Sequence, residues 1–406
     1  MAKRWLRGPQ IVTPGTTQNG VDHVPVMMFW YLFLVELCGW THVDEVVTGG
    51  PTRTFTNGFE ANNTDGTLTN SDYTFTTIST PFVVGDIGKF LCILDTSNPE
   101  NCGIYEIVGY TSSSVVTINF YAPGGTFPAA QGSLSWWMLD TNNASYTPVT
   151  FGDYFVVESP HSTYPFEMKV EYTLAGNYGG GRVEVSPNSG AWNAGSHVWN
   201  TGARVMTGWT IWDRYYSDVP QSRAYAMADE DGAFALFWND RSAASFVQAT
   251  MVALVDPLES SPARSANERL MIAGGGNGFS TTGENNEVDR GDDAGGLGIG
   301  QVWEDYSNRW RWVQMMALRD EASGVDYFSR NIGVNARTGE RDALPFMYTI
   351  SAEAADHRFA PHSKIPIAHI SMGTAVAVGE LTPFDSDDYY HLRDGSVIPW
   401  NGLPQA

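Results

Sequence analysis

Charged residues are scarce in this chain, and basic residues are the scarcer kind. Asp, Glu, Lys and Arg make up 17% of the 406 residues, and 45 acidic residues against 23 basic ones give a formal charge of −22. Such a surface repels nucleic-acid phosphates and anionic lipid headgroups, so we expect neither nucleic acid nor a membrane as a partner. The basic N-terminal residues Lys3, Arg4 and Arg7 are interpreted as a solubilising or docking tail.

Cysteine is also rare, which excludes a dense disulfide framework. The three cysteines are Cys38, Cys92 and Cys102, and the sequence has no Cys-x-x-Cys pair that would indicate structural zinc. Cys92 and Cys102 lie on or beside successive predicted strands, so a disulfide between them is one interpretation. We favour two thiols in a protein assembled in a reducing cytosol.

The chain lacks a long apolar run. Residues 24–38 are apolar for about 15 positions, short of the ~20 that span a membrane, and they include Pro25 and Glu36. We predict a buried helix instead, with Asp22 as N-cap, Pro25 in its first turn and Gly39 at its end. The helix has no polar face, so the β-domains or another subunit must enclose it.

The N-terminal segment 1–20 has little hydrophobicity. Its basic start is followed by polar residues with Pro9 and Pro14, where a signal peptide would be apolar. We expect an extended arm that lies against a neighbouring subunit, in a protein made in the cytoplasm.

What the chain does have is apolar and small polar residues in short alternating runs. Hydrophobic residues are 42% and aromatic residues 13%, and Gly, Ser, Thr and Asn supply most of the polarity. This composition predicts a mainly β fold of several small sandwich or barrel modules, with one buried N-terminal helix. The predicted parts are an extended arm (1–20), an apolar helix and connector (21–47), a β-module (48–142), a β-sandwich-like domain (143–259), a Gly/Asp-rich linker loop (260–300) and a C-terminal β-rich segment (301–406).

Individual strands follow from period-two patterns between turn signals. Asp229-Glu-Asp-Gly232 separates two of them and indicates a tight hairpin. The predicted strands cover 89–94, 104–108, 115–120, 134–139, 154–158, 167–173, 181–185, 224–228, 233–237, 246–255, 364–371 and 374–381, with a final hairpin at 394–402.

One stretch resembles a known class of protein. Gly85-Asp-Ile-Gly-Lys89 leads into a strand, and Asn101-Cys-Gly-Ile-Tyr-Glu-Ile107 forms the next one. In wording, this resembles the small β-modules of tailed-bacteriophage virion proteins. The "GWT" that ends the predicted helix and the Asp394–Gly402 closing are similar to other phage structural proteins. The resemblance implies an assembly component of a virion.

Catalytic and metal-binding patterns are weak. The eight histidines include no His-Glu-x-x-His, and no Gly-x-Ser-x-Gly elbow occurs. His357 and His362 flank Pro361 in a loop, without carboxylates at a spacing that suits zinc. The segment 295–300 is rich in glycine but has no Lys-Ser/Thr pair for phosphate. We therefore expect no enzyme activity and no cofactor.

Two acidic patterns have structural alternatives. Asp229, Glu230 and Asp231, or Asp385, Asp387 and Asp388, could supply a glycosidase pair, but we interpret both groups as turn residues. Asn63-Thr-Asp-Gly66 with Asp72 partly fits a calcium loop, except that Ala61 occupies the place of its first acidic ligand. We predict no metal at either place.

Tryptophan is abundant, with 14 in the chain. We interpret most of these rings as core or interface residues. The segment Gly190–Trp199 is the best candidate for sugar binding, because its small residues would leave the rings accessible. The candidate glycan-binding residues are Trp192, Asn193, His197 and Trp199.

Together these patterns predict a non-enzymatic structural subunit of a phage particle. We place it in the virion, assembled in the host cytoplasm, and favour tail, neck or baseplate over capsid decoration. Its expected partners are other copies of itself and other virion proteins. The alternative is a receptor- or glycan-binding adhesin at a tail tip or fibre, with a host surface glycan as partner. The candidate interface residues are Arg4, Trp5, Arg7, Phe29, Trp30 and Phe33.

Overall fold

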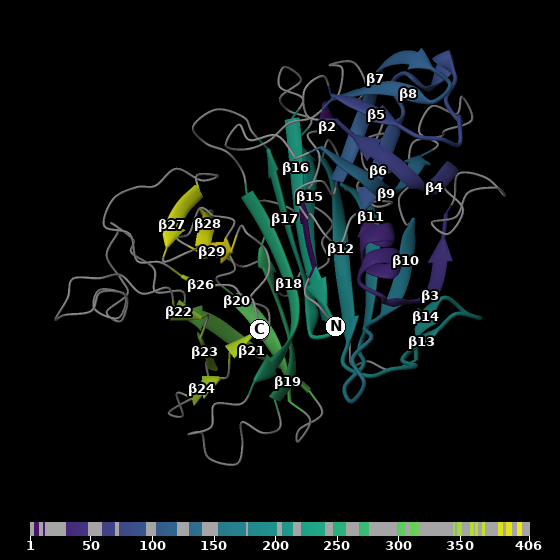
Figure 1. Ribbon diagram of the computed structural model, residues 1–406. Helices are drawn as coiled ribbons and strands as arrows, with labels where there is room; N and C mark the ends of the chain where they lie inside the picture. The colour runs from purple at the N-terminus through teal and green to yellow at the C-terminus, as the bar shows by residue number, and fades with distance from the viewer. Residues whose placement is uncertain are drawn as a thin grey trace.

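The computed structural model is mainly β, with one short helix and a closed barrel, which confirms the coarse part of the predicted fold class. The described strands lie in three sheets and one closed barrel, with a two-stranded hairpin beside them (Figure 1). The structure describes residues 4–7, 11–12, 30–47, 59–69, 73–94, 103–119, 130–139, 153–175, 178–200, 205–213, 221–239, 247–256, 268–275, 299–304, 309–316, 344–345, 347–350, 358–360, 362–363, 368–369, 381–384, 387–391 and 396–399.

The barrel is formed by β4 to β9 and contains the Gly85–Lys89 motif. Its strands close in the order β4 (Phe59–Leu68), β5 (Thr74–Thr76), β8 (Val115–Asn119), β7 (Gly103–Ser112), β6 (Phe90–Leu94) and β9 (Gln131–Leu139). A 3₁₀ turn, η2 (Val84–Asp86), precedes β6. All six strands fall within the predicted β-module of 48–142.

A five-stranded antiparallel sheet follows, with a small hairpin beside it. Its order is β15 (Val205–Asp213), β12 (Tyr178–Ser186), β11 (Glu167–Ala175), β10 (Tyr154–Glu158) and β3 (Thr41–Val46). The hairpin consists of β13 (Trp192–Asn193) and β14 (Val198–Trp199). Thus β3, from the predicted connector, completes a sheet of the next predicted domain.

The largest sheet has eleven strands. Its main order is β1 (Arg4–Arg7), β16 (Gln221–Asp229), β17 (Gly232–Asn239), β18 (Val247–Asp256), β19 (Glu268–Gly275), β20 (Ile299–Glu304), β21 (Arg309–Met316), β23 (Met347–Ile350) and β24 (Arg358–Ala360); β2 (Ile11–Val12) pairs with β16, and β25 (His362–Ser363) with β18. The β18–β19 pairing joins strands on either side of the boundary predicted at 259/260.

The remaining strands form a small C-terminal sheet. Its order is β22 (Leu344–Pro345), β26 (Ala368–His369), β29 (Ser396–Pro399), β28 (Asp387–His391) and β27 (Leu381–Phe384). Of the segment 394–402, which was predicted as a final hairpin, the structure describes β29. This strand pairs with β28, which precedes the segment.

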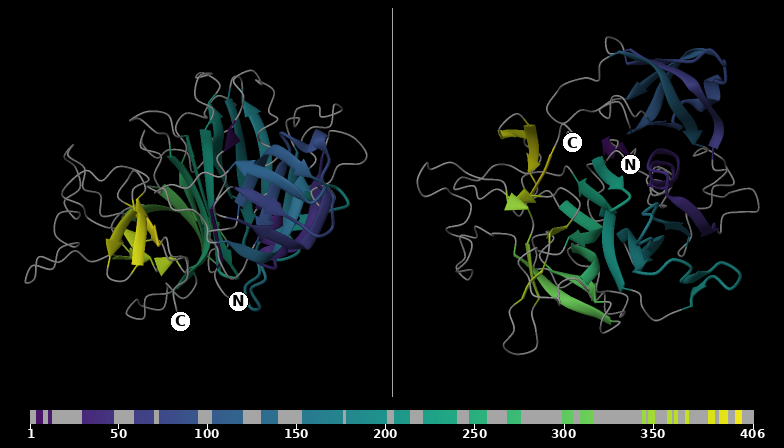
Figure 2. Two further views of the ribbon diagram at one scale, coloured as in Figure 1. Left: turned by 45° about the horizontal axis from the view of Figure 1, so that its top comes forward. Right: turned by 60° about the horizontal axis from the view of Figure 1, so that its bottom comes forward.

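A helical turn lies where the barrel meets the sheets (Figure 2). Residues 30–32 are helical and continue into the π-helix η1 (Phe33–Leu37). The Cys38 N–H donates to the Phe33 carbonyl at 3.0 Å, and Gly39 ends the turn with φ +72°. Gly39 was predicted as this end, and its positive φ is the conformation that glycine adopts most readily. Residues 24–29 lie outside the described part of the chain.

The helical turn is enclosed by its own chain. Phe33 and Leu34 are 0% exposed, and their core cluster includes side chains of β6, β10, β11, β12, β18 and β19. The sequence left two possibilities for what encloses this helix, the β-domains or another subunit. For the described residues 30–34 it is the β-domains. Trp30 and Phe33 were wrong as interface candidates, because they are 4% and 0% exposed and pack inside the subunit.

Strand β6 connects the two cores, because all five of its residues are buried. Its alternate side chains point to opposite faces. Leu91 and Ile93 pack inside the barrel, while Phe90, Cys92 and Leu94 belong to the central core around the helical turn. The apolar run 90–94 in the sequence is explained by burial on both faces.

Cys38 and Cys92 are buried thiols and not half-cystines. This agrees with the favoured interpretation for Cys92, whereas Cys102 lies outside the described residues. In the part of the chain that the structure describes, no helix has the length and hydropathy needed to span a bilayer.

Candidate functional site

The predicted glycan segment forms a hairpin over a polar face of the five-stranded sheet. On β11, Met168 and Val170 face the central core, and they alternate with the charged residues Glu167, Lys169 and Glu171. Glu167, Lys169 and Glu171 are nevertheless only 2%, 8% and 7% exposed. Since successive residues of a strand face opposite sides, these charges lie on the second face of the sheet, where Trp192 contacts two of them.

Asp44 of β3 is the centre of this polar cluster. Its Oδ2 accepts the Trp192 indole N–H at 2.7 Å, lies 2.8 Å from His197 Nδ1, and accepts the Tyr154 hydroxyl at 3.4 Å. The Asp44 side chain is 10% exposed and that of His197 is 51% exposed. His197 therefore covers the carboxylate from the solvent side.

Two further carboxylates hold the hairpin. Glu167 accepts the backbone N–H groups of Gly190 at 2.9 Å and Trp192 at 2.6 Å. Burial raises the pKa of Glu167 above its ordinary value, and these hydrogen bonds oppose the rise. Glu184 accepts the Trp199 indole N–H at 2.6 Å.

Lys169 is a buried cation on this face. Its Nζ lies 3.1 Å from Glu171 Oε2 and 4.3 Å from the centre of the Tyr154 ring. An ammonium group over an aromatic face is stabilised by the ring quadrupole, especially where water is excluded. Burial, together with Asp44 and Glu171, raises the pKa of the Tyr154 hydroxyl, which therefore remains a neutral donor.

The rings of this cluster are packed against one another. The Trp192 and Trp199 centroids are 5.0 Å apart at 85°, and Tyr154 meets Trp192 edge-on at 5.5 Å. Trp192 is only 6% exposed. The expectation that small neighbours leave this ring accessible was wrong, because the hairpin folds it onto the sheet. Asn193 instead shapes the turn, as its Oδ1 accepts the Gly195 and Ser196 N–H groups at 3.0 and 3.2 Å.

Sequence reasoning brought four hairpin residues together and missed the carboxylates beneath them. Asp44 and Glu184 come from β3 and β12, far apart in the chain. One signal was available: Glu167-Met-Lys-Val-Glu171 alternates charge with apolar residues. Such a pattern normally indicates a face that is exposed to solvent. Only the position of the β13–β14 hairpin in the structure shows that this face is covered.

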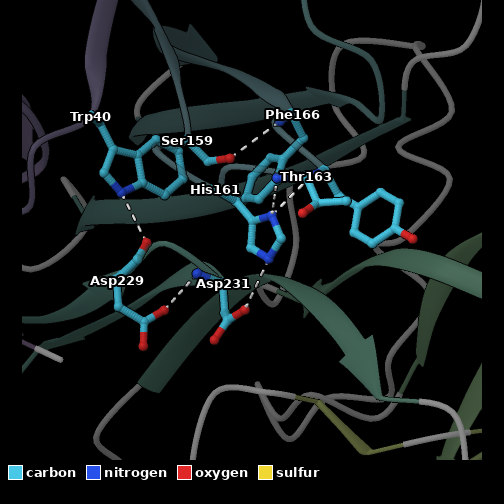
Figure 3. Close-up of polar contacts among 8 residues, drawn as sticks. Trp40, Ser159, His161, Thr163, Phe166, Asp229 and Asp231 are labelled. Carbon is cyan, nitrogen blue, oxygen red and sulfur yellow. Dashed lines mark hydrogen bonds and ion pairs between the residues drawn. The ribbon is translucent and has the colours of Figure 1, made fainter. Parts of the chain in front are cut away.

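A second polar group surrounds the β16–β17 hairpin (Figure 3). Asp229 Oδ1 accepts the Asp231 N–H at 2.8 Å, and the Asp229 carbonyl accepts the Trp40 indole N–H at 3.1 Å. Asp229 pairs with Gly232 across the turn, which confirms the predicted hairpin. Asp229 therefore acts as a turn residue, as interpreted from the sequence.

His161 lies beside this turn but is not arranged as a general base. Its Nδ1 accepts the Thr163 N–H at 3.1 Å and the Tyr164 N–H at 2.9 Å, so the proton is on Nε2, which faces Asp231 at 3.7 Å. The hydroxyl of Ser159 accepts the Phe166 N–H at 3.2 Å. Neither ring nitrogen offers an acceptor to a nucleophile.

The Gly85–Lys89 motif has a structural role in the barrel. Asp86 is 1% exposed; its Oδ2 accepts the Val83 N–H at 2.7 Å, and its Oδ1 lies 2.9 Å from Lys89 Nζ. Gly88 has φ +90° and donates its N–H to the Ile107 carbonyl at 2.7 Å. The Gly-Asp-Ile-Gly-Lys pattern thus fixes the turn that leads into β6.

The calcium-like motif also has a structural explanation. Asp65 Oδ1 accepts the Thr77 hydroxyl at 2.7 Å and the Trp136 indole N–H at 3.0 Å, while Oδ2 accepts the Ile78 and Ser79 N–H groups at 3.0 and 2.8 Å. Gly66 is required by packing, because a Cβ there would lie 2.7 Å from the Phe75 ring. Asp72 lies outside the described residues.

The remaining candidate residues lie on strands whose backbones alone are described, or outside the described ranges. Arg4, Trp5 and Arg7 lie on β1, and His362 on β25, with only their backbones described. Asp387 and Asp388 pair in β28 with Phe384 and Pro383. Phe29, His357, Asp385 and residues 295–298 lie outside the described ranges. Within those ranges, no group of three His, Cys, Asp or Glu residues could hold a metal ion.

Comparison with known proteins adds no relative. No protein-family model matches the chain, and no curated protein sequence matches it.

Proposed function

We propose that this chain is a non-enzymatic structural subunit of a tailed-phage particle. It acts by associating with copies of itself and with other virion proteins. Within the particle we favour the tail, neck or baseplate over capsid decoration. The phage-like wording of the barrel segment supports the particle. The described part of the N-terminal arm lies against β16 of its own chain and not against a neighbouring subunit, as the sequence had suggested. Its edge position supports the assembly role, because an edge strand can exchange between copies.

The observation that carries the proposal is that the arm supplies the edge of the largest sheet. Arg4–Arg7 pairs with Ala228–Tyr225 of β16, and Ile11–Val12 pairs with Ser222–Gln221. Both strands are antiparallel and cover the same side of β16, opposite β17. An edge strand is held mainly by backbone hydrogen bonds, which any copy of the same segment can form equally well.

An arm of this kind can exchange between subunits. When the arm of one copy occupies β16 of the next, each hydrogen bond of the closed subunit is replaced by an identical one. The exchange costs little free energy and links subunits without any new surface. A head-to-tail exchange that closes on itself gives a ring, which suits a tail, neck or baseplate component.

Disulfide trapping tests this arrangement. Leu6 lies opposite Ala226, which in turn lies opposite Ala235 of β17. A Leu6→Cys/Ala226→Cys variant brings two thiols within the 4.4–6.8 Å Cα separation of a disulfide. In Leu6→Cys/Ala235→Cys, the matched control, the thiols are two strands apart, roughly 10 Å, and cannot bridge.

We expect the 6/226 variant to form intermolecular disulfides in assembled protein, seen as a ladder on non-reducing gels, and the 6/235 control to form none. Assembled protein that yields only intrachain disulfides contradicts arm exchange. A chain that remains monomeric at every concentration, and that is missing from purified particles by mass spectrometry, contradicts the structural role itself.

The adhesin alternative has weaker support from the geometry. The indole N–H groups of Trp192 and Trp199 are bound by the chain's own carboxylates. A sugar would need those donors or an open ring face. Binding of the isolated protein on a glycan array, lost in a Trp199→Ala variant, would favour the adhesin over the structural subunit.

A further inference from the structure

The loop between β10 and β11 is folded around the imidazole ring of His161. This side chain is 15% exposed, and its Nδ1 accepts the backbone N–H groups of Thr163 at 3.1 Å and Tyr164 at 2.9 Å (Figure 3). Asn and Asp fold tight turns in a similar way, with a side-chain oxygen that accepts a backbone N–H further along the chain. His161 thus holds the tip of the loop with an acceptor that protonation removes.

The base of this loop is closed independently of His161. Ser159 donates its N–H to the Phe166 carbonyl at 2.9 Å, and the Ser159 hydroxyl accepts the Phe166 N–H at 3.2 Å. The Phe166 ring is 0% exposed and meets the Trp40 ring edge-on at 5.4 Å. None of these groups titrates near neutral pH, so a change of charge on His161 acts on the tip of the loop and leaves its base in place.

The other ring nitrogen of His161 faces a different sheet. Its Nε2 lies 3.7 Å from Oδ1 of Asp231, in the tight turn between β16 and β17, and the Asp231 side chain is 20% exposed. This separation is longer than a hydrogen bond, but it brings opposite charges together once the ring is protonated. The ring therefore lies between two partners, the amides of its own loop and a carboxylate of the largest sheet.

The groups around the ring favour its positive form. The β16–β17 turn carries three acidic residues, Asp229, Glu230 and Asp231. On the loop itself, the Tyr164 ring is stacked on the His161 ring with the ring centres 5.8 Å apart. Carboxylates and an aromatic face both attract a cation.

The other charged residues beside the loop are placed differently. Glu158 and Glu167, at the ends of β10 and β11, accept hydrogen bonds from residues 189–192 on the second face of the five-stranded sheet. Arg4 of β1 pairs with the residue before Asp229, and only its backbone is described. Asp231 is therefore the carboxylate that meets the ring in the described part of the chain.

Protonation makes the two partners of the ring incompatible. Neutral His161 carries its proton on Nε2 and uses Nδ1 as the acceptor. A proton taken from water by Nδ1 turns that acceptor into a donor, which then faces two other N–H donors. Both hydrogen bonds of the loop are lost, whereas the attraction between Nε2 and Asp231 increases. Histidine ordinarily changes its charge between about pH 5 and 8, so the exchange of partners belongs to mildly acidic solution.

We propose that His161 is a proton-operated switch between the five-stranded sheet and the largest sheet. At neutral pH its ring folds the tip of its own loop. In mildly acidic solution the protonated ring releases the Thr163 and Tyr164 amides and binds the β16–β17 turn through Asp231. The loop tip then opens, and the two sheets gain a charged contact beside β16, the strand on which the arm pairs.

Hydrogen–deuterium exchange of the full chain tests this switch, with rates corrected for the intrinsic effect of pH. We expect the Thr163 and Tyr164 amides to lose protection at least about tenfold between about pH 8 and about pH 5. The Phe166 amide, at the base of the loop, should keep its protection over the same range.

Two substitutions separate His161 from other titrating groups. His161→Asn is the matched variant, because its side-chain oxygen accepts backbone N–H groups at every pH in this range. Its loop amides should change in protection by less than about twofold. His197→Asn, at a histidine that is 51% exposed on the β13–β14 hairpin, is the control and should leave the loop as pH-dependent as in the wild-type chain.

Nitrogen NMR of the chain with isotope-labelled histidine reports the protonation of Nδ1 directly. Loss of amide protection that follows the protonation of His161 supports the switch. A protonated His161 with the Thr163 and Tyr164 amides still protected overturns it. Constant protection in the wild-type chain overturns it too, and so does an equal loss in the wild-type chain and in His161→Asn, since another group would then be responsible.

Discussion

At the scale of single residues, carboxylates act here as acceptors for backbone and indole N–H groups. Asp65 and Asp86 hold the loops of the barrel, and Asp44 holds the β13–β14 hairpin. Each is bound to donors of its own chain, and hydrogen bonds to a charged acceptor are the stronger kind. An acidic chain thus uses part of its charge to fix turns and short hairpins.

Asp65 gives the sharpest prediction at this scale. Replacement of Asp65 by Ala leaves the Trp136 and Thr77 donors without their acceptor and should lower the free energy of unfolding by about 2 kcal/mol. Asn62→Ala, at an exposed position of the same strand, is the control and should change it by less than about 0.5 kcal/mol. Urea titration at pH 7 measures both.

The Asp65 contribution should also depend on pH. Partial burial raises the pKa of Asp65, but the hydrogen bonds from Thr77, Trp136 and Ser79 outweigh it and lower the pKa to about 2. The unfolded value is about 3.9, so the stabilisation is complete above that pH and is lost as the pH falls toward 2. The difference between wild type and Asp65→Ala should therefore shrink between pH 4 and 2. A constant difference would contradict the lowered pKa.

At the scale of elements, the helical turn lies at the centre of the central core. Side chains of β6 from the barrel, of the five-stranded sheet of β3 and β10, and of the eleven-stranded sheet, including Trp303, pack in one cluster with Trp30–Leu34. The apolar side chains Trp30–Leu34 are stable only when protein covers them, whereas Glu36 of the same turn is exposed. The turn therefore fixes the barrel against the sheets.

Phe33→Asp tests that role. Phe33 is 0% exposed, so the variant buries a charge without a partner and should cost several kcal/mol, enough to give insoluble protein. Phe33→Leu is the conservative control and should cost about 1 kcal/mol while leaving the chain folded. Thermal melts of the soluble fractions give the comparison. A soluble Phe33→Asp chain with a wild-type melting temperature would refute the buried position.

At the scale of the whole molecule, the described strands of the arm belong to the largest sheet and not to the barrel. Removal of residues 1–20 deletes β1 and β2 and uncovers β16, but it leaves the barrel, the helical turn and the five-stranded sheet intact. We expect the truncated chain to remain folded, with unchanged near-ultraviolet circular dichroism, and to lose incorporation into particles. Incorporation at the wild-type level would show that the arm has no assembly role.

The sequence by itself determined the β-rich class, the positions of β6 to β12 and of β16 to β18, the hairpin at Asp229–Gly232 and the end of the helical turn at Gly39. These features depend on residues near one another in the chain, where period-two patterns and glycine conformation act locally. Tertiary structure alone decided that Trp30 and Phe33 lie inside the subunit, that the Trp192 ring is covered, and that Asp44 lies beneath it. Each of those depends on which distant strands pair, because burial and hydrogen-bond partners are set by neighbours in space and not by neighbours in sequence.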